Sequence, residues 1–493
     1  MARKPNSAMD GRLLQRVSKS LDDVVGVFSP AAALSRARHR FAYEVLDNSQ
    51  VRKKRSGLAG TGDKHLTANN LGRLREITRD LSRNNPLAKG LLKTERDGVI
   101  GSGVKIQART NDKKFNEKAE KLWTEYMVQQ ACDVTGRFNF NKLLSTSYLS
   151  YRRDGDMLIL FTDAGIQAIE GDRIGTPGKG IAAKQFTVTN GVATSNATGR
   201  VIGYYIGKPN NWGRIDAGSY KKFKAVDASH IFNPDRFSQS RGEPALTASI
   251  DWIDKLCGYM DAELVAAKVN ACFTMFIKTD DENIPDAYTD GVSSSGETAD
   301  GSQVEKMEPG SIIYGGPGES AMGIGMTRPG NMFDPFVQRM LTFIGRPLCM
   351  PLMLITLDFA GATFMNARIA YQKVQEAWQG EQDFVVKPLV WRSYRWFIDK
   401  MIKESKLKDR SDKYACQVQC HRWPYVDPYK EGMADKIQLI NGTTTRHKII
   451  ARQGDEYDEI HADLAAEKKQ RDADGLNEIP EKPGVKNDTA NKK

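Results

Sequence analysis

Four carboxylates near two strand-like runs have the residue types and spacing best suited to catalysis in this chain. Two lie just before the run at 157–162 and two just after the run at 166–169: Asp154, Asp156, Glu170 and Asp172. If the runs pair, the carboxylates converge and can hold divalent cations that stabilise the attacking and leaving oxygens of a phosphodiester. This pattern raises the hypothesis of a metal-dependent nuclease. The alternative is that these are acidic, solvated strand ends.

Other catalytic and metal-binding patterns are incomplete. Cys416, Cys420 and His421 are spaced like zinc ligands, but no second ligand pair lies at finger spacing. A calcium-loop-like string that begins at Asp286 has Tyr288 at a ligand position. No phosphate-binding loop of the form Gly-x-x-x-x-Gly-Lys-Ser/Thr occurs. We therefore expect no catalytic residue, no bound metal and no cofactor.

Apolar residues at intervals of three and four predict one long helix over 244–272, with Pro244 at its first position. At about 1.5 Å per residue such a helix would be roughly 40 Å long, more than most globular helices. Its other side is rich in Ala, which suits close packing against copies of itself. The residues expected to pack along the apolar stripe are Leu246, Ile250, Ile253, Met260, Leu264 and Ala267.

Charge is distributed unevenly along the 493 residues. Of the 72 Lys and Arg and the 61 Asp and Glu, 22 and 10 lie within 1–110, which leaves 50 and 51 for the remainder. The net positive charge therefore belongs to the first fifth of the chain. Such a region either faces nucleic acid or an acidic protein surface, or is simply a solvated surface.

The composition, with 40% hydrophobic and 27% charged residues, permits two to four cored domains. The most apolar run, 347–357, contains two prolines and is far shorter than the roughly 20 residues that cross a bilayer. We therefore expect no membrane span. The six scattered cysteines indicate a reducing compartment rather than a disulfide framework.

Local patterns place further elements on either side of the long helix. Helices are predicted at 71–92 and 116–129 and a further strand at 201–206, which makes the region before 240 an α+β domain. A short strand is predicted at 273–277. The remaining helices are predicted over 334–344, with Asp334 as its cap and Pro335 at its first position, and over 365–401, with interruptions at Gly380 and Pro388.

The amino-acid sequences of several segments, and their order along the chain, resemble those of one protein family. The RGEPAL entry and the YMDAELVAAKVNA body of the long helix, the upstream DLSRNNPLAKGLLKTERDGVIGSGVKIQAR, and the downstream KMEPGSIIYGGPGE, FDPFVQRMLTFIGRPLCMP and NARIAYQKVQEAWQ follow one another in the same order. Together with VDPYKEGMADKIQLINGTTTRHKIIARQGDEYDE, they make the chain similar to the lambda-type portal proteins of tailed bacteriophages over roughly 33–475.

The resemblance implies an α+β portal fold with an α+β wing, a helical stem, a small β-containing clip and a helical crown, assembled as a ring. The parts it implies are an N-terminal arm (1–32), the wing (33–240), a first stem helix (241–272), the clip (273–332), a second stem helix (333–346), the tunnel loop with a long wing helix (347–400), the crown (401–475) and a disordered tail (476–493).

It also implies a structural rather than enzymatic function. The expected assembly is a homo-dodecameric ring at one vertex of the capsid, whose channel passes double-stranded DNA during packaging and ejection. Expected partners are the terminase packaging motor, a head–tail adaptor and the major capsid protein or scaffold. The protein would lie in the virion, and in the host cytoplasm during assembly.

Two sets of residues are candidates for contacts in that ring. An acidic stretch without Lys or Arg falls in the implied clip and would dock the motor or adaptor through Asp280, Asp281, Glu282, Asp286 and Asp290. The segment at 356–366 corresponds to the tunnel loop that touches DNA, with candidates Asp358, Phe359, Thr363, Phe364 and Asn366. The alternative for the two phenylalanines is that both pack beneath the wing.

Overall fold

The computed structural model describes residues 61–64, 66–178, 185–272, 275–278, 312–315, 332–425, 427–454 and 457–475. The chain divides into two units, 1–65 and 66–493. Only a short 3-10 helix, Gly62–Lys64, is described in the first unit, so the account below concerns the second. The expected N-terminal arm, the acidic candidates of the clip and the expected disordered tail lie outside the described residues.

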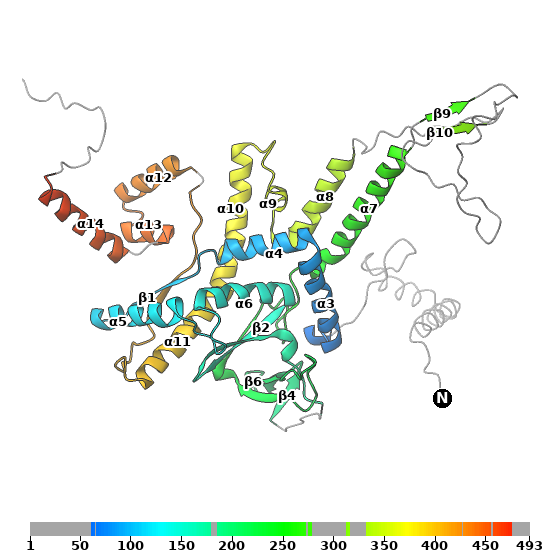
Figure 1. Ribbon diagram of the computed structural model, residues 1–493. Coiled ribbons are helices and arrows are strands. Elements are labelled where there is room, and N and C mark those ends of the chain that lie inside the picture. The colour runs from blue at the N-terminus through cyan, green and yellow to red at the C-terminus, as the bar shows by residue number, and fades with distance from the viewer. Residues whose placement is uncertain are drawn as a thin grey trace, which may run out of the picture. The chain divides into compact units, whose positions relative to one another are not determined.

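The helix predicted at 71–92 is wrong in one respect, because it is two helices, α3 (Ala68–Asn84) and α4 (Pro86–Val99) (Figure 1). Asn85 ends the first in an extended conformation and caps the second, its side chain accepting a hydrogen bond from Ala88 N at 3.0 Å. Pro86 follows at a position where a missing N–H costs nothing.

Two further helices complete the framework around the first sheet. α5 (Lys113–Trp123) continues as a π-helical turn over Thr124–Gln129, and α6 (Phe140–Asp154) leads directly into the sheet. Trp123 packs edge-on against Phe140 and Phe397 at centroid distances of 5.1 and 5.2 Å. The main hydrophobic core therefore joins early helices to one near residue 400.

The strands predicted at 157–162, 166–169 and 201–206 are confirmed. β2 (Asp156–Thr162) lies between β3 (Gly165–Glu170) and β8 (Ala228–Phe232), both antiparallel to it. A second antiparallel sheet holds β4 (Phe186–Thr189), β5 (Val192–Ser195), β6 (Val201–Ile206) and β7 (Lys221–Lys224) in that order.

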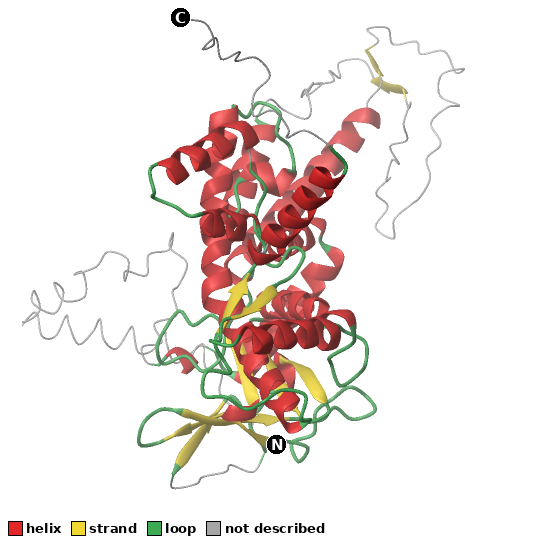
Figure 2. Cartoon of the chain, turned by 90° about the vertical axis from the view of Figure 1, so that its left-hand side faces the viewer, coloured by secondary structure: helices red, strands yellow, loops and turns green. Residues whose placement is uncertain are grey.

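β2 is buried on both faces, as its continuous apolar run requires. Met157 and Ile159 belong to the core formed with the helices, whereas Leu158 and Leu160 belong to a second core shared with β5 and β6. Successive side chains of a strand point to opposite faces, so the central strand separates the two cores. Figure 2 shows the strands of these sheets in the lower half of the view, below most of the helices.

A two-stranded ribbon connects distant parts of the sequence. β1 (Lys105–Ala108) pairs antiparallel with β11 (Cys416–Gln419), with Lys105 opposite Gln419 and Ala108 opposite Cys416. The segment after 403 thus returns to the early helices, and the helical C-terminal region begins only at α12 (Pro428–Ile440), followed by α13 (Arg446–Gln453) and α14 (Tyr457–Ala473).

The predicted long helix exists but begins later than expected. α7 spans Ile250–Cys272, preceded by a 3-10 turn at Thr247–Ser249. Pro244 is not its first residue, because the Pro244 carbonyl accepts hydrogen bonds from Thr247 N at 3.0 Å and Thr247 Oγ1 at 2.7 Å, which closes a tight turn. With 23 residues, α7 is about 35 Å long rather than roughly 40 Å.

Two strands and a second helix follow α7. β9 (Met275–Lys278), the strand predicted at 273–277, pairs in parallel with β10 (Ile312–Gly315). α8 (Phe333–Gly345) then packs against α7. The prediction that Asp334 caps α8 is wrong: Asp334 lies inside its first turn, and Met332 occupies the cap position without a side-chain hydrogen bond.

The helix predicted over 365–401 is confirmed, but Gly380 and Pro388 lie inside α-helices and the irregular stretch lies between them. α10 (Phe364–Glu381) and α11 (Lys387–Lys403) are joined by a π-helical turn, η9 (Gln382–Val386), rather than by a break (Figure 1). The fully buried Gln382 donates from Nε2 to the carbonyls of Val99 at 2.8 Å and His421 at 2.9 Å. Among the described helices, none is both long and apolar enough to cross a membrane.

Candidate subunit interface and channel segment

A fully buried carboxylate at the start of β2 is bonded by side chains from three separate parts of the chain. Asp156 accepts from Arg75 Nη2 at 2.8 Å, from Arg241 Nη2 at 3.1 Å and from Arg241 Nε, and its Oδ2 lies 3.2 Å from His230 Nε2. All four side chains are buried. A carboxylate can be buried only when charge and hydrogen bonds replace the water that it loses.

The other three candidate carboxylates gather around a different arginine, Arg79. Asp154 accepts from Arg79 Nη2 at 2.9 Å and from Arg153 Nη2 at 2.7 Å. Glu170 and Asp172 are exposed and lie 3.7 and 3.3 Å from Arg79 nitrogens. The prediction that these four carboxylates come near one another is therefore confirmed.

Their chemistry contradicts the nuclease hypothesis. Metal sites need carboxylate oxygens free to bind a cation, but the two buried carboxylates here are occupied by arginines, which a cation would have to displace. In the part of the chain that the structure describes, no three His, Cys, Asp or Glu side chains are placed to hold a metal ion. Cys416, Cys420 and His421 are among the described residues, so they do not form such a group either.

Electrostatics fix the protonation of this cluster. Burial alone would raise the pKa of Asp156, but the charge of Arg241, the hydrogen bond from His230 and the charge of Arg75 outweigh it and hold the pKa well below its ordinary value. Burial lowers the pKa of His230, and the nearby arginine charges lower it further against the opposing effect of Asp156. At neutral pH the cluster holds an ionised aspartate and a neutral imidazole.

Arg241 connects this cluster to the loop that precedes α7. Its Nη1 donates to the carbonyls of Ile174 at 2.9 Å and Asn190 at 2.8 Å, and its Nη2 donates to the carbonyl of Gly171. The next residue, Gly242, is in close contact with Gly155, where an added Cβ would lie 2.7 Å from the Gly242 oxygen. The loop that enters α7 is thereby fixed to the α6–β2 junction.

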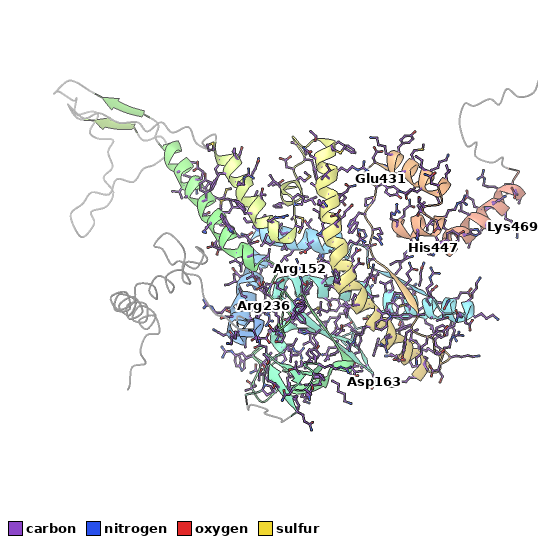
Figure 3. The ribbon with its side chains drawn as sticks, turned by 180° about the vertical axis from the view of Figure 1, so that it is seen from behind. Arg152, Asp163, Arg236, Glu431, His447 and Lys469 are labelled. Carbon is purple, nitrogen blue, oxygen red and sulfur yellow. The ribbon has the colours of Figure 1, made fainter. Side chains whose placement is uncertain are left out.

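A second buried network begins one turn earlier on α6. Arg152 holds Glu95 of α4 with two hydrogen-bonding distances of 2.7 and 3.1 Å, and its Nη1 lies 3.5 Å from Glu381 of α10. The Arg152 carbonyl accepts from Ala245 N at 2.9 Å, again at the entry to α7. Figure 3 shows Arg152 at the junction of these helices. Burial raises the pKa of Glu95, opposed by the charge of Arg152.

The apolar stripe predicted for the long helix divides into two halves. Leu246 and Ile253 are fully buried and Ile250 packs against the core, but Met260 is exposed and Leu264 is 55% exposed. Ala267 is half-buried. The chain itself therefore covers only the first half of the stripe.

The second helix of the pair completes this surface. Ser249 Oγ donates to the Ile344 carbonyl at 2.8 Å, and Tyr259 packs against Phe336 at 4.9 Å between ring centroids. Large apolar side chains nevertheless remain exposed on the two helices: Trp252, Met260, Leu264, Val265, Phe336 and Phe343. Exposed apolar side chains grouped on neighbouring elements indicate a surface that another protein covers.

The channel candidates occupy a short connection and the start of a helix. After α9 (Leu352–Thr356), residues 357–363 connect to α10, with Leu357 and Gly361 in the left-handed region. Asp358 Oδ1 accepts from Ala360 N at 2.8 Å, and Thr363 Oγ1 caps α10 by accepting from Asn366 N at 3.4 Å.

Two of the five candidates therefore do not lie in the loop. Phe364 and Asn366 belong to the first turn of α10, because Thr363 provides the helix cap one residue before Phe364. Phe359 and Phe364 are each 54% exposed, which contradicts the alternative that both pack beneath the wing. The Lys430 Nζ lies 5.8 Å from the Phe364 ring centroid, so this turn faces α12.

The buried arginines were missed by reasoning from sequence. Arg241 opens the RGEPAL motif, which was singled out only as a helix entry, and nothing in the local pattern around Arg75 distinguishes it from a solvated arginine. A charged residue directly before Gly-x-Pro at a helix entry was the one available signal.

Comparison with known proteins decides the family. The model of the phage portal proteins of the lambda family matches residues 52–382, more than half of the chain. The chain belongs to this family. It is accordingly a portal protein, part of the head–tail connector of a bacteriophage virion.

Individual relatives are distant but cover most of the sequence. The chain is similar to a probable portal protein of Halomonas phage phiHAP-1, with 22% identity over 92% of this chain and 91% of the relative. It is similar to portal protein B of Escherichia phage lambda, with 20% identity over 80% and 83%. Among solved structures, the chain is similar to a chain in the neck of an empty gene transfer agent particle, with a TM-score of 0.38, 14% identity and coverage of 77% and 93%.

Replacing Asp156 by Asn is expected to destabilise this portal protein by about 3–5 kcal/mol, because Arg75 and Arg241 would stay buried without a counter-charge. Asp172→Asn, at an exposed carboxylate, should cost less than about 1 kcal/mol. Urea denaturation of the two variants measures both. Equal midpoints for both variants and the wild type would show that the cluster contributes no stability.

Acidification is expected to lower stability in two steps. Because the folded pKa of His230 is depressed, its contribution is complete above the unfolded value of about 6.5 and is lost as pH falls below it. The depressed pKa of Asp156 adds a second loss below about pH 4. Urea midpoints at about pH 7.5, 5.5 and 3.5 should fall less between the first two values in His230→Asn than in the wild type, and should fall again at the third in both. The exposed His461→Asn should behave like the wild type, and a wild-type midpoint that is constant from pH 7.5 to 5.5 would contradict the assignment.

Proposed function

We propose that this portal protein assembles as a dodecameric ring at one capsid vertex and that α7 and α8 form the stem that encloses a channel for double-stranded DNA. The observation that carries the proposal is the helix pair whose inner half is buried in its own chain while its outer half exposes apolar side chains. Membership of the portal family supports it.

The two stem helices have complementary surfaces. In a closed ring each contact is made by two different patches, one from each neighbour. The outer part of α7 carries small residues at Ala262, Ala266 and Ala267, whereas α8 exposes Phe336 and Phe343. Aromatic side chains of one stem that pack over the alanines of the next would cover both patches.

The charge on the stem suits a channel for DNA. α7 carries Asp251, Asp254, Asp261 and Glu263 against two lysines. Rotational symmetry repeats each of these charges around the ring. Duplex DNA carries one negative charge per about 1.7 Å of axis, so an attractive wall would hold it, whereas an acidic wall lets it slide.

The connection between α9 and α10, together with the first turn of α10, supplies the contact with DNA. Phe359 and Phe364 present apolar rings to solvent, and Asp358 adds negative charge beside them. A ring of such side chains would narrow the channel and touch DNA without a charge that could trap it.

The remaining parts are assigned by the same proposal. Residues 273–332 form the clip, where Asp280, Asp281, Glu282, Asp286 and Asp290 dock the terminase motor and later the head–tail adaptor. Residues 33–240 form the wing and residues 401–475 form the crown, in which β11 pairs with β1 of the wing and the helices from α12 onward follow. Capsid protein or scaffold surrounds the ring, which assembles in the host cytoplasm.

Replacing Val265 by Glu is expected to prevent ring formation, because it would bury a charge between neighbouring stems. A dodecamer of the 54.9 kDa chain has a mass of about 660 kDa, which light scattering resolves from a monomer. Val226→Glu, at an exposed valine of the wing, serves as the matched control and should assemble normally. A Val265→Glu ring of full mass would place the interface elsewhere.

The double variant Phe359→Ser with Phe364→Ser is expected to form intact rings, because both side chains are more than half exposed and little packing is lost. DNA packaging should nevertheless fall at least tenfold, since the constriction is removed. Phe384→Ser, at the more exposed phenylalanine of η9, should package normally. Packaging of nuclease-protected DNA measures both, and normal packaging by the double variant would remove these residues from the channel.

A further inference from the structure

A polar cleft of about 1370 Å³ separates α10 and β11 from α12 and α13. Figure 3 shows Glu431 and His447 on the two helices of its far wall. Its lining is unusual in residue type, because seven glutamines face it: Gln372, Gln375, Gln379, Gln417, Gln419, Gln438 and Gln453.

The glutamines are arranged by the periods of the elements that carry them. Gln372, Gln375 and Gln379 lie on one face of α10 at intervals of three and four residues. On β11, Gln417 and Gln419 alternate with Cys416 and Val418, which pack against the hydrophobic core. Helix and strand therefore each bury an apolar face and turn an amide face to the cleft.

One of these amides has no hydrogen-bond partner. Gln419 is only 8% exposed, and neither its Nε2 nor its Oε1 is hydrogen-bonded. The Nε2 of the buried Gln107, on the paired strand β1, is also without a partner. A buried amide left in this condition costs stability, so its presence in the wall of a cleft points to a ligand that completes it.

The cleft also carries unneutralised positive charge. Three of its cations are in ion pairs: Arg368 with Glu431 at 3.3 Å, Arg452 with Asp435 at 2.9 Å, and Lys387 with Asp383. Within the described ranges, Arg422 and Lys448 line the cleft without an ion-pair partner. A ligand that carries carboxylates would meet both.

The walls are held in place before any ligand arrives. Trp423 Nε1 donates to the Gly98 carbonyl at 2.8 Å, and Tyr425 OH donates to Asp435 at 2.5 Å. Gln453 Nε2 lies 3.4 Å from the Tyr425 hydroxyl. The extended segment between β11 and α12 is thus fixed at both ends, which lowers the entropy lost on binding.

We propose that this cleft binds an extended, acidic peptide segment of a partner protein. Each residue of an extended peptide offers one N–H and one C=O. A glutamine side chain can accept a hydrogen bond from the N–H through its oxygen and donate one to the C=O through its NH₂ group. Carboxylates of the peptide would pair with Arg422 and Lys448. The site is distinct from the stem and the channel segment, so it does not depend on the proposed ring.

Two other occupants fit less well. A DNA duplex would bring its phosphates close to Glu431 and Asp435, which line the same cleft. The chain's own residues 476–493 contain four lysines against three acidic residues, so their charge does not complement Arg422 and Lys448.

The test is fluorescence-anisotropy binding of a labelled decapeptide of alternating Glu and Ala to the full-length protein. The double variant Arg422→Ala with Lys448→Ala should weaken binding at least tenfold. The control, Arg446→Ala with Lys436→Ala, removes two exposed charges outside the cleft and should leave binding unchanged. Equal affinity of the double variant and the wild type, or equal binding of a Lys–Ala decapeptide, a peptide of residues 476–493 or a short DNA duplex, would overturn the proposal.

Gln419→Leu separates a ligand contact from a structural role. Because its amide has no partner in the free protein, the substitution should leave the thermal midpoint unchanged or raise it, while peptide binding weakens severalfold. A lowered midpoint would show that the amide is satisfied within the protein, and unchanged binding would show that it does not contact the peptide. Either result counts against the proposal.

Discussion

The burial of one negative charge constrains the placement of the elements around it. Removing the Asp156 carboxylate from water costs several kcal/mol, which is offset only if its partners are held at hydrogen-bonding distance. Those partners come from α3, from β8 and from the entry to α7, through Arg75, His230 and Arg241. The α3 helix, the sheet and the entry to α7 cannot shift independently without leaving a buried charge unpaired.

Arg152, four residues before Asp156, belongs to the second buried network. That network extends the constraint to α10. Arg152 binds α4 and α10 with its side chain and the entry to α7 with its carbonyl. Glu381, which it contacts, is the last residue of α10 before the π-helical turn, where Gln382 joins two further carbonyls. A π turn lacks the regular hydrogen bonds of an α-helix, and these side-chain bonds hold it in one geometry. Residues 152–156 therefore connect the entry to α7, the sheet and α10.

Sequence patterns predicted the elements better than their connections. The alternation and length of the runs were enough for β2, β3 and β6, and the three-four spacing was enough for most of α7, because those signals are local. The pairing of Arg75 and Arg241 with Asp156 joins residues 81 and 85 positions apart, and β1 pairs with a strand more than 300 residues later. The local spacing of apolar residues carries no information about contacts between such distant residues. The apolar stripe of α7 shows the same limit, since burial within a chain and burial between chains require the same residues.

The connection at 357–363, where contact with DNA is proposed, is almost wholly exposed. α9 has no buried residue. The connection that follows contains Leu357 in the left-handed region, a conformation that costs a residue other than glycine about 1–2 kcal/mol. Segments with few buried contacts open at the lowest free energy. Because the α10 helix that follows is anchored at its far end through Glu381 and Gln382, a change in the connection need not disturb the sheet or the buried charge cluster. A subunit built in this way can keep a rigid base while this exposed connection changes conformation.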